Sequence, residues 1–207
     1  MVSEPNQRLR PRLLSADDPV FLLRWLRYPT RVGAVTPSGR ALSKAMVRPV
    51  DWSKPGHVVE LGAGMGAFTR VLMQQAPNID RLLVVERDPV FFARLQRQVP
   101  SAPLAMGDAA DLPNLLARHG VEEVSAIVSG LPILSMSRDI QGQIITGALN
   151  AGPDPIFIQF TYGFRSPVPL PRLAEWGVKA ERCGFVAMNV PPAWVWCYRK
   201  VNSAAAI

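Results

Sequence analysis

Residues 57–66 read His57-Val-Val-Glu-Leu-Gly-Ala-Gly-Met-Gly66, and this stretch decides the fold. Its first half is an apolar run of the kind that forms a buried strand, and three glycines then interrupt it. Gly62 allows a tight turn, Gly64 lets the backbone approach a ligand closely, and Gly66 opens a helix whose N–H groups can face polar ligand atoms. A strand, a glycine turn and a helix in this order are the repeating unit of a parallel α/β sheet.

The same unit repeats along the chain. We expect strands at 57–61, 81–86, 102–106, 124–129 and 155–161, with helices at 67–75, 89–98, 111–119 and 137–149. Two further strand-like stretches, around 186–189 and 194–199, are joined by a Pro-Pro pair, and the prolines of 166–171 predict a stiff loop. The sequence therefore predicts a Rossmann-like α/β fold with a mainly parallel seven-stranded sheet and an antiparallel C-terminal edge hairpin.

Three acidic residues stand at the ends of the first three strands. Glu60 lies two positions before the first glycine, Glu86 ends the second strand, and Asp108 follows the third within Gly107-Asp-Ala109. A carboxylate at the first place suits an ammonium and would repel a pyrophosphate, the second suits the hydroxyls of a ribose, and the third suits an adenine amine. Each acid alone has a simpler explanation as a helix cap, but three in succession favour one ligand with amino-acid and nucleoside parts.

This combination resembles class I S-adenosylmethionine-dependent methyltransferases across about residues 57–135. The resemblance implies S-adenosylmethionine as the cofactor and no metal. It places cofactor contacts at Glu60, Gly62, Ala63, Gly64, Gly66, Glu86, Arg87, Gly107, Asp108, Ala109 and Ser129.

The motif after the fourth strand bears on the methyl acceptor. Enzymes that methylate base amines carry Asn/Asp-Pro-Pro and an aromatic that stacks on the flipped base. This chain has Ser129-Gly-Leu-Pro132, and Ile133 stands in place of the aromatic. A nucleobase acceptor is therefore disfavoured, and nucleic acid is not an expected partner.

Four other runs carry a more specific resemblance. They are Val32-Gly-Ala-Val-Thr-Pro-Ser38, Ser129-Gly-Leu-Pro-Ile-Leu134, Gln159-Phe-Thr-Tyr-Gly163 and Asn189-Val-Pro-Pro-Ala-Trp194. Over about residues 18–200 the chain resembles bacterial phospholipid N-methyltransferases of the soluble, membrane-associated type. The resemblance implies stepwise methylation of phosphatidylethanolamine toward phosphatidylcholine. Ornithine-lipid N-methyltransferases are similar, and the related rRNA adenine dimethyltransferases share the core, so both remain alternatives. One departure is Met65, where threonine is more usual.

The candidate acceptor site combines aromatic, carbonyl and basic groups. Tyr162, at the end of the fifth strand, is the first candidate for orienting the amine, and Tyr28 is the second; both have ordinary packing roles as alternatives. The carbonyls of Ser129 and Gly130 are placed to hold the amine's hydrogens. For the lipid phosphate we expect Arg31 and Arg165.

Positive charge is concentrated before Val50. This segment contains nine basic and three acidic residues, so it accounts for six of the seven net positive charges of the chain. The basic residues are Arg8, Arg10, Arg12, Arg24, Arg27, Arg31, Arg40, Lys44 and Arg48. Such asymmetry indicates an anionic partner.

An amphipathic helix is expected over residues 17–28, followed by a second helix at 37–48. The apolar face and the arginines of the first helix suit an anionic membrane surface. These residues are Phe21, Leu22, Trp25 and Leu26 with Arg24 and Arg27. Packing of this helix on its own domain is the alternative. We divide the chain into a basic arm with membrane or lid helices (1–50) and a methyltransferase domain (51–207).

Two cysteines and two histidines leave little support for a metal site or a disulfide framework. Cys197 lies in an alternating strand-like run, and we expect it to be a reduced core residue. No apolar run is long enough to cross a bilayer, and the N-terminus lacks the apolar core of a signal peptide. We therefore expect a cytoplasmic monomer associated peripherally with the inner face of the plasma membrane.

Overall fold

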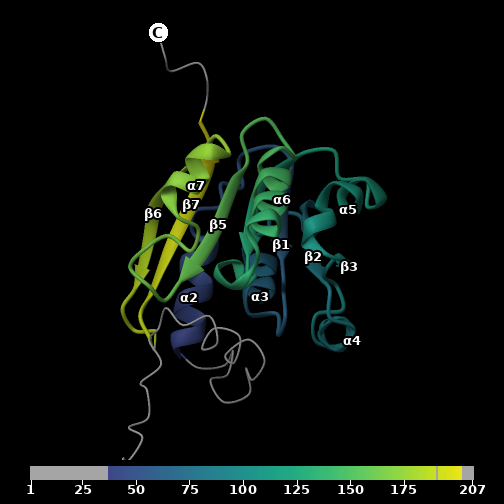
Figure 1. Cartoon of the computed structure of the whole chain (residues 1–207). Helices are drawn as coiled ribbons and strands as arrows, with labels where there is room; N and C mark the ends of the chain where they lie inside the picture. Colours follow the sequence, from purple (N-terminus) through teal and green to yellow (C-terminus); the bar gives the residue numbers. More distant parts are fainter. Residues whose placement is uncertain (1–36, 190, 202–207) are drawn as a thin grey trace, which may run out of the picture.

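The computed structural model describes residues 37–189 and 191–201, and its centre is one seven-stranded sheet (Figure 1). The strand order is β3-β2-β1-β4-β5-β7-β6. The strands are β1 (His57–Leu61), β2 (Leu82–Glu86), β3 (Leu104–Met106), β4 (Val124–Ser129), β5 (Ile156–Thr161), β6 (Val178–Val186) and β7 (Ala193–Lys200). The first five are parallel, whereas β7 runs antiparallel to both β5 and β6. This arrangement confirms the predicted Rossmann-like fold.

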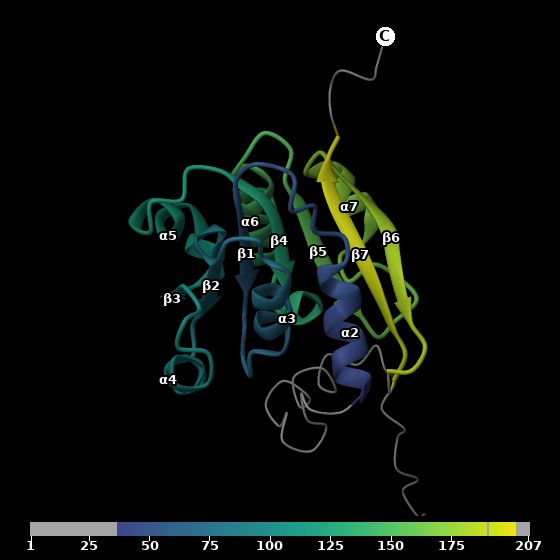
Figure 2. The same ribbon diagram turned by 180° about the vertical axis from the view of Figure 1, so that it is seen from behind.

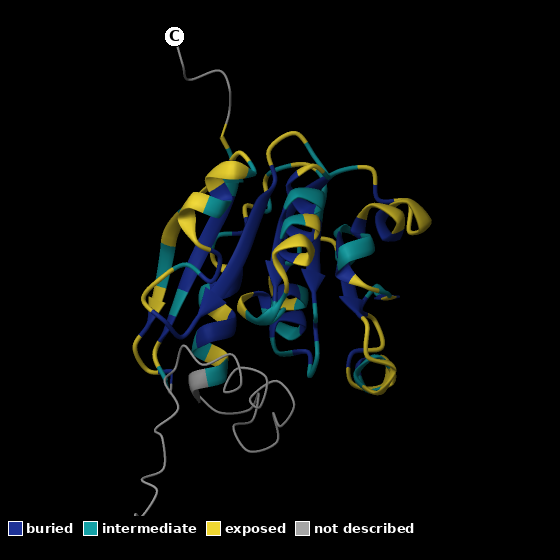
Figure 3. Ribbon diagram, viewed as in Figure 1, coloured by how far each residue is buried: buried dark blue, intermediate teal, exposed yellow. Residues whose placement is uncertain are grey.

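Helices cover both faces of the sheet (Figure 2). They are α2 (Pro37–Val47), α3 (Ala67–Gln75), α4 (Pro89–Gln98), α5 (Leu112–Arg118), α6 (Arg138–Leu149) and α7 (Leu170–Glu175), with short 3-10 helices η2 (Ile79–Arg81), η3 (Ala109–Asp111) and η4 (Ile133–Ser135). One apolar core packs α2, α3 and α4 on one face, and a second packs α5, α6 and α7 on the other. Coverage on both sides explains why the central strands are buried along their whole length (Figure 3).

The predicted strand at 186–189 is wrong, because β6 lies earlier, at Val178–Val186. This strand is at the edge of the sheet, where one side meets solvent, so charged residues such as Glu181 interrupt its apolar pattern. The preceding short helix α7 was also not predicted, because its first turn lies within the proline-rich stretch read as a loop. Pro at the first turn of a helix is compatible with helical geometry.

The expected reduced cysteine is also wrong. Cys183 and Cys197 form a disulfide between β6 and β7, with their Cα atoms 6.0 Å apart. The ladder shifts register between Arg182 and Gly184, and this irregularity brings Cys183 against Cys197 although the regular partner of Cys197 is Glu181. The cysteines therefore give no support to a cytoplasmic location.

Of the two helices predicted near the N-terminus, only the second lies within the described residues. The helix expected at 17–28 lies outside the described residues, whereas the helix expected at 37–48 is α2. Among the helices that the structure describes, none combines the length and the apolarity that crossing a bilayer requires.

Candidate functional site

The glycine loop between β1 and α3 is held against the neighbouring strand β2. The N–H groups of Gly62 and Ala63 both donate to the Val85 carbonyl, at 2.9 and 3.3 Å. A Cβ on Gly62 would lie 2.7 Å from the Leu131 side chain, whereas a Cβ on Gly64 would meet no described atom within 4 Å. The loop is thus closely packed on the protein side at Gly62 and open at Gly64, where a ligand can approach the backbone.

Glu60 is a fully buried carboxylate at the end of β1, directly beneath this loop. Neither of its oxygens makes a hydrogen bond of normal geometry within the described part of the chain. Burial is the main cause that raises the pKa of Glu60 to about 8; the nearby Thr69 and Arg70 oppose this increase, and the charge of Glu86 adds to it. An unpaired buried acid is costly, so this carboxylate fits a ligand that brings a positive charge.

Glu86 ends β2 and is tied into the loops on either side of it. One carboxylate oxygen accepts a hydrogen bond of 2.7 Å from the Gly64 N–H, and the other accepts bonds of 2.8 Å from the N–H groups of Arg87 and Asp88. These bonds fix the carboxylate at the carboxyl edge of the sheet. The oxygen that accepts only the Gly64 N–H keeps accepting capacity, and it suits a ribose hydroxyl.

Asp108 lies after β3 and caps the short helix η3, whose first residue is the buried Ala109. One oxygen accepts from the Ala110 N–H at 3.0 Å, and the other pairs with the Arg87 guanidinium at 2.9 Å. The Ala110 N–H and, with it, the Arg87 side chain hold the pKa of Asp108 below its usual range. Asp108 is therefore an ionised hydrogen-bond acceptor. Its exposed ion pair holds the Arg87 side chain at the carboxyl edge of the sheet.

Tight packing at two other glycines shapes the same edge. A Cβ on Gly107 would lie 2.4 Å from the Leu115 side chain, and one on Gly130 would lie 2.6 Å from the Gly62 carbonyl oxygen. The Gly130 N–H also donates to the Leu61 carbonyl at 2.8 Å. The loop after β4, which carries Ser129 and Gly130, is thus in backbone contact with the glycine loop.

Tyr162 lies just beyond β5 and is 7% exposed. Its ring meets that of Phe160 edge to face, with centroids 5.5 Å apart. Burial raises the pKa of the Tyr162 hydroxyl, and a hydrogen bond with the Asn189 side chain partly opposes this. The hydroxyl therefore stays protonated near neutral pH, where it can orient a polar group but does not act as a base.

Of the other predicted acceptor side chains, one lies within the described residues. Arg165 is exposed in the loop after β5. Tyr28 and Arg31 lie outside the described residues, as do the six residues of the expected membrane helix.

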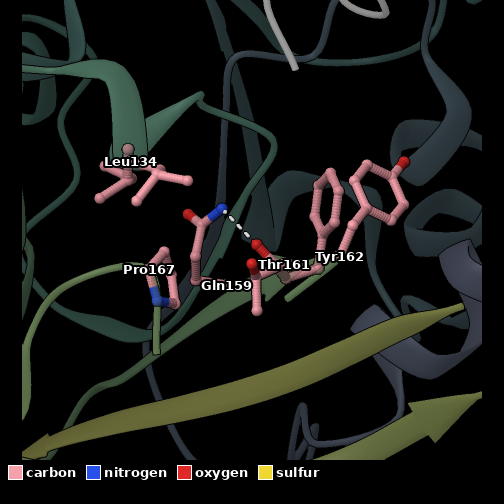
Figure 4. Close-up of a pocket in the computed structure, with 7 residues that line it drawn as sticks. Leu134, Gln159, Thr161, Tyr162 and Pro167 are labelled. Carbon is pink, nitrogen blue, oxygen red and sulfur yellow. Dashed lines mark hydrogen bonds between the residues drawn. The ribbon is translucent and has the colours of Figure 1, made fainter. Parts of the chain in front are cut away.

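Gln159 belongs to the run Gln159-Phe-Thr-Tyr-Gly163, and the sequence alone assigns it no role. Gln159 lies in β5, is 2% exposed, and lines a pocket with the loop after β4 (Figure 4). The pocket residues are Ile133, Leu134, Gln159, Phe160, Thr161, Tyr162 and Pro167. The signal that could have identified it is a single amide within the apolar run Ile156–Phe160.

Comparison with known proteins gives one relative over nearly the whole chain. The ornithine lipid N-methyltransferase of Singulisphaera acidiphila is 30% identical over 190 residues, which cover 89% of this chain and 97% of the relative. The ribosomal RNA small subunit methyltransferase A of Bordetella pertussis is 35% identical over 89 residues, 43% of this chain and 32% of the relative. No family model matches the chain.

Solved structures share the fold at low sequence identity. Magnesium protoporphyrin IX methyltransferase from Synechocystis PCC 6803, with bound S-adenosylhomocysteine, has a TM-score of 0.59 and 11% identity. The match covers 87% of this chain and 94% of that chain. The fold is therefore that of enzymes that bind S-adenosylmethionine or its product.

Proposed function

The chain belongs to the family of S-adenosylmethionine-dependent methyltransferases that includes ornithine lipid N-methyltransferase, and from this we propose that it methylates the head-group amine of phosphatidylethanolamine. The proposed products are the mono- and dimethyl forms and then phosphatidylcholine. The main support for a lipid amine as acceptor is the length of the match, since the ornithine lipid enzyme matches 89% of the chain. The ribosomal RNA enzyme matches less than half of it.

The residues at the carboxyl edge of the sheet fit S-adenosylmethionine. Glu60 is a buried carboxylate without a normal hydrogen-bond partner among the described residues, Gly64 presents open backbone, and Glu86 keeps accepting capacity. We assign these groups to the amino-acid and ribose parts of the cofactor, and Asp108 to the adenine amine. When bound, the cofactor supplies a methyl group activated by a sulfonium.

The protein must hold the acceptor amine as a neutral nucleophile facing that methyl group. A primary amine is mostly protonated at neutral pH, so it has to release a proton to solvent water before its lone pair attacks. We propose that the carbonyls of Ser129 and Gly130 accept its hydrogens and that Tyr162 orients it. Arg165, with Arg31, is proposed to bind the lipid phosphate.

Two other methyl acceptors, ornithine lipid and an rRNA adenine, are ranked by specific observations. Ornithine lipid also offers a primary amine, and the relative of that name makes it the second candidate. An adenine of ribosomal RNA is disfavoured, because Ile133, which stands in place of the stacking aromatic, is 1% exposed and belongs to the core beneath α6.

We further propose that the protein works at an anionic membrane surface. The expected helix with Phe21 and Trp25 on one face and Arg24 on another is the main contact. A second apolar surface surrounds Trp194 of β7, where Phe164 and Phe185 contact its ring at centroid distances of 6.4 and 4.4 Å. With the exposed Met188 these three aromatics form what we call the hairpin patch.

The hairpin patch has the composition of a membrane-facing surface. Phe164 and Met188 are 74% and 76% exposed, which is unusual for large apolar side chains close to one another. The Arg182 guanidinium lies 4.7 Å from the centre of the Trp194 ring, so a cation accompanies the apolar groups. Aromatic rings with neighbouring arginines suit the interface of an anionic bilayer.

Deleting residues 1–30 is expected to abolish binding to vesicles that contain anionic lipid, while the remaining chain still folds. The Phe164→Ser/Met188→Ser variant should keep the N-terminal contact and bind about three- to tenfold more weakly, because less apolar area enters the interface. Val201→Ser is the control, since Val201 is 54% exposed at the opposite end of β7. Vesicle co-sedimentation measures all four proteins. Unchanged binding after the deletion would rule out the N-terminal contact.

The proposed reaction is tested by incubating the purified chain with labelled S-adenosylmethionine and vesicles. The vesicles contain phosphatidylethanolamine, ornithine lipid and an anionic lipid, and the extracted lipids are separated. We expect label in mono-, di- and trimethylated phosphatidylethanolamine. Label confined to ornithine lipid would replace the substrate and keep the lipid class. Absence of label in every lipid, with cofactor binding intact, would refute a lipid acceptor.

A further inference from the structure

The side-chain amide of Gln159 has hydrogen-bond partners for its nitrogen and none among the described residues for its oxygen. Its Nε2 donates to the Leu131 carbonyl at 3.1 Å and to the Phe160 carbonyl at 3.2 Å. Its Oε1 is buried and has no hydrogen-bond partner within the described residues. Because both amide hydrogens already point to carbonyl oxygens, turning the amide over would bring oxygen against oxygen, so the oxygen's direction is fixed.

This oxygen lies next to the acceptor loop. Gln159 pairs in register with Ser129 of β4, and the Leu131 carbonyl that it holds belongs to the residue whose side chain packs against Gly62. In Figure 4 the Gln159 oxygen points toward Leu134, on the opposite side from the hydrogen bond donated by its nitrogen. The Gln159 amide is thus bonded to the loop after β4, and its oxygen faces the side of the pocket that Leu134 lines.

We infer that Gln159 Oε1 accepts a hydrogen bond from one of the two N–H groups of the neutral methyl acceptor, with a carbonyl of Ser129 or Gly130 accepting the other, and that it thereby favours acceptors that still carry N–H groups. This inference rests on the proposed amine acceptor. A buried amide oxygen without a partner is unfavourable, and an amine N–H removes that cost when it arrives. Much of the pocket lining is apolar, and no donor of the described residues bonds to this oxygen.

The number of N–H groups on the acceptor distinguishes this role from a structural one. Phosphatidylethanolamine as a neutral amine has two N–H groups, its monomethyl form has one, and its dimethyl form has none. A residue that only supports the fold affects all three acceptors equally. Gln159 should matter most for the first and least for the last.

The matched control is Gln141, a second buried glutamine that braces the same loop. It is 3% exposed, and its Nε2 donates to the carbonyls of Ile133 and Met136, at 2.8 and 3.2 Å. Its oxygen, however, already accepts a hydrogen bond of 2.9 Å from Arg172. Gln141→Met therefore removes a comparable anchor without removing an available acceptor.

The experiment measures kcat/KM for the three acceptors with wild type, Gln159→Met and Gln141→Met. We expect Gln159→Met to lower kcat/KM about 10- to 100-fold for phosphatidylethanolamine and less than about threefold more than the control for the dimethyl form. Gln141→Met should lower all three by one common factor. Equal losses for all acceptors in Gln159→Met would overturn the inference and leave the reaction standing. Lack of wild-type activity on all three lipids would instead refute the proposed function, and this inference with it.

Discussion

Replacing Glu60 by glutamine is expected to stabilise the protein at alkaline pH and to remove S-adenosylmethionine binding. The folded chain holds the Glu60 proton up to about pH 8, whereas the free carboxyl has a pKa of 4.5. The unfolded chain therefore binds fewer protons between these values, and the free energy of unfolding falls as the pH rises through them. Glutamine has nearly the same shape and never ionises, so it avoids this loss.

The size of the effect follows from the shift. One pKa unit corresponds to about 1.4 kcal/mol, so Glu60→Gln should gain several kcal/mol at pH 9 and almost nothing near pH 5. For a chain of this length each kcal/mol corresponds to about 2–4 °C, so the melting temperature should rise by about 10 °C at pH 9. The same variant loses the anion that meets the cofactor's ammonium, so cofactor affinity should fall at least about 100-fold.

Thermal unfolding between pH 5 and 9 and calorimetric titration with S-adenosylmethionine measure the two effects. Glu181→Gln is the control, because Glu181 is an exposed acid on β6 and should change neither quantity. In the wild type, cofactor affinity should increase with pH up to about pH 8, because the bound ammonium requires the ionised carboxylate. A variant that keeps wild-type cofactor affinity would show that Glu60 is not the ammonium-binding group. A variant that gains no stability at pH 9 would show that burial does not raise the pKa of Glu60.

The position of the groups that we propose to bind the cofactor was predictable, because their signals are local in sequence. The glycines of 62–66 lie within one turn, and the acids Glu60, Glu86 and Asp108 each follow a strongly apolar strand. Parallel strands bring their carboxyl ends to one edge, so three local patterns suffice to assemble a site. The structure adds that Glu86 is fixed by three backbone N–H groups, which no pattern of side chains reveals.

The parts that sequence reasoning missed depend on contacts between distant residues. The Cys183–Cys197 disulfide needs the register shift in the β6–β7 ladder. The role that we infer for Gln159 depends on which atoms of its amide have hydrogen-bond partners, and one partner is the carbonyl of Leu131, 28 residues away. Such facts become visible only when the strands are placed side by side.

Replacing Gly130 by alanine is expected to inactivate the enzyme through backbone displacement at both loops. The new Cβ would lie 2.6 Å from the Gly62 carbonyl oxygen and 3.5 Å from that of Leu61. The first distance is too short for a carbon and an oxygen, and neither group is a flexible side chain that can move aside. The loop that carries the acceptor carbonyls must therefore separate from the loop that binds the cofactor.

The displacement affects catalysis more than folding. Overpacking of this kind costs about 1–3 kcal/mol of stability, which a domain with two apolar cores tolerates. A shift of about 1 Å between reacting groups, however, costs about 100-fold in rate, and we expect kcat to fall by at least that factor. Cofactor affinity should fall less, because Glu60 and Glu86 remain in place.

Gly147→Ala is the matched control, since a Cβ at this position in α6 would meet only Pro113, at 3.9 Å or more. Alanine in a helix is favoured over glycine by about 0.5–1 kcal/mol, so this variant should be slightly more stable and fully active. Methyl transfer rates and thermal unfolding of the two variants give the comparison. If Gly130→Ala retained more than about a third of the wild-type kcat, the close contact between the two loops would have no part in positioning the acceptor. The assignment of the Ser129 and Gly130 carbonyls would then have to be abandoned.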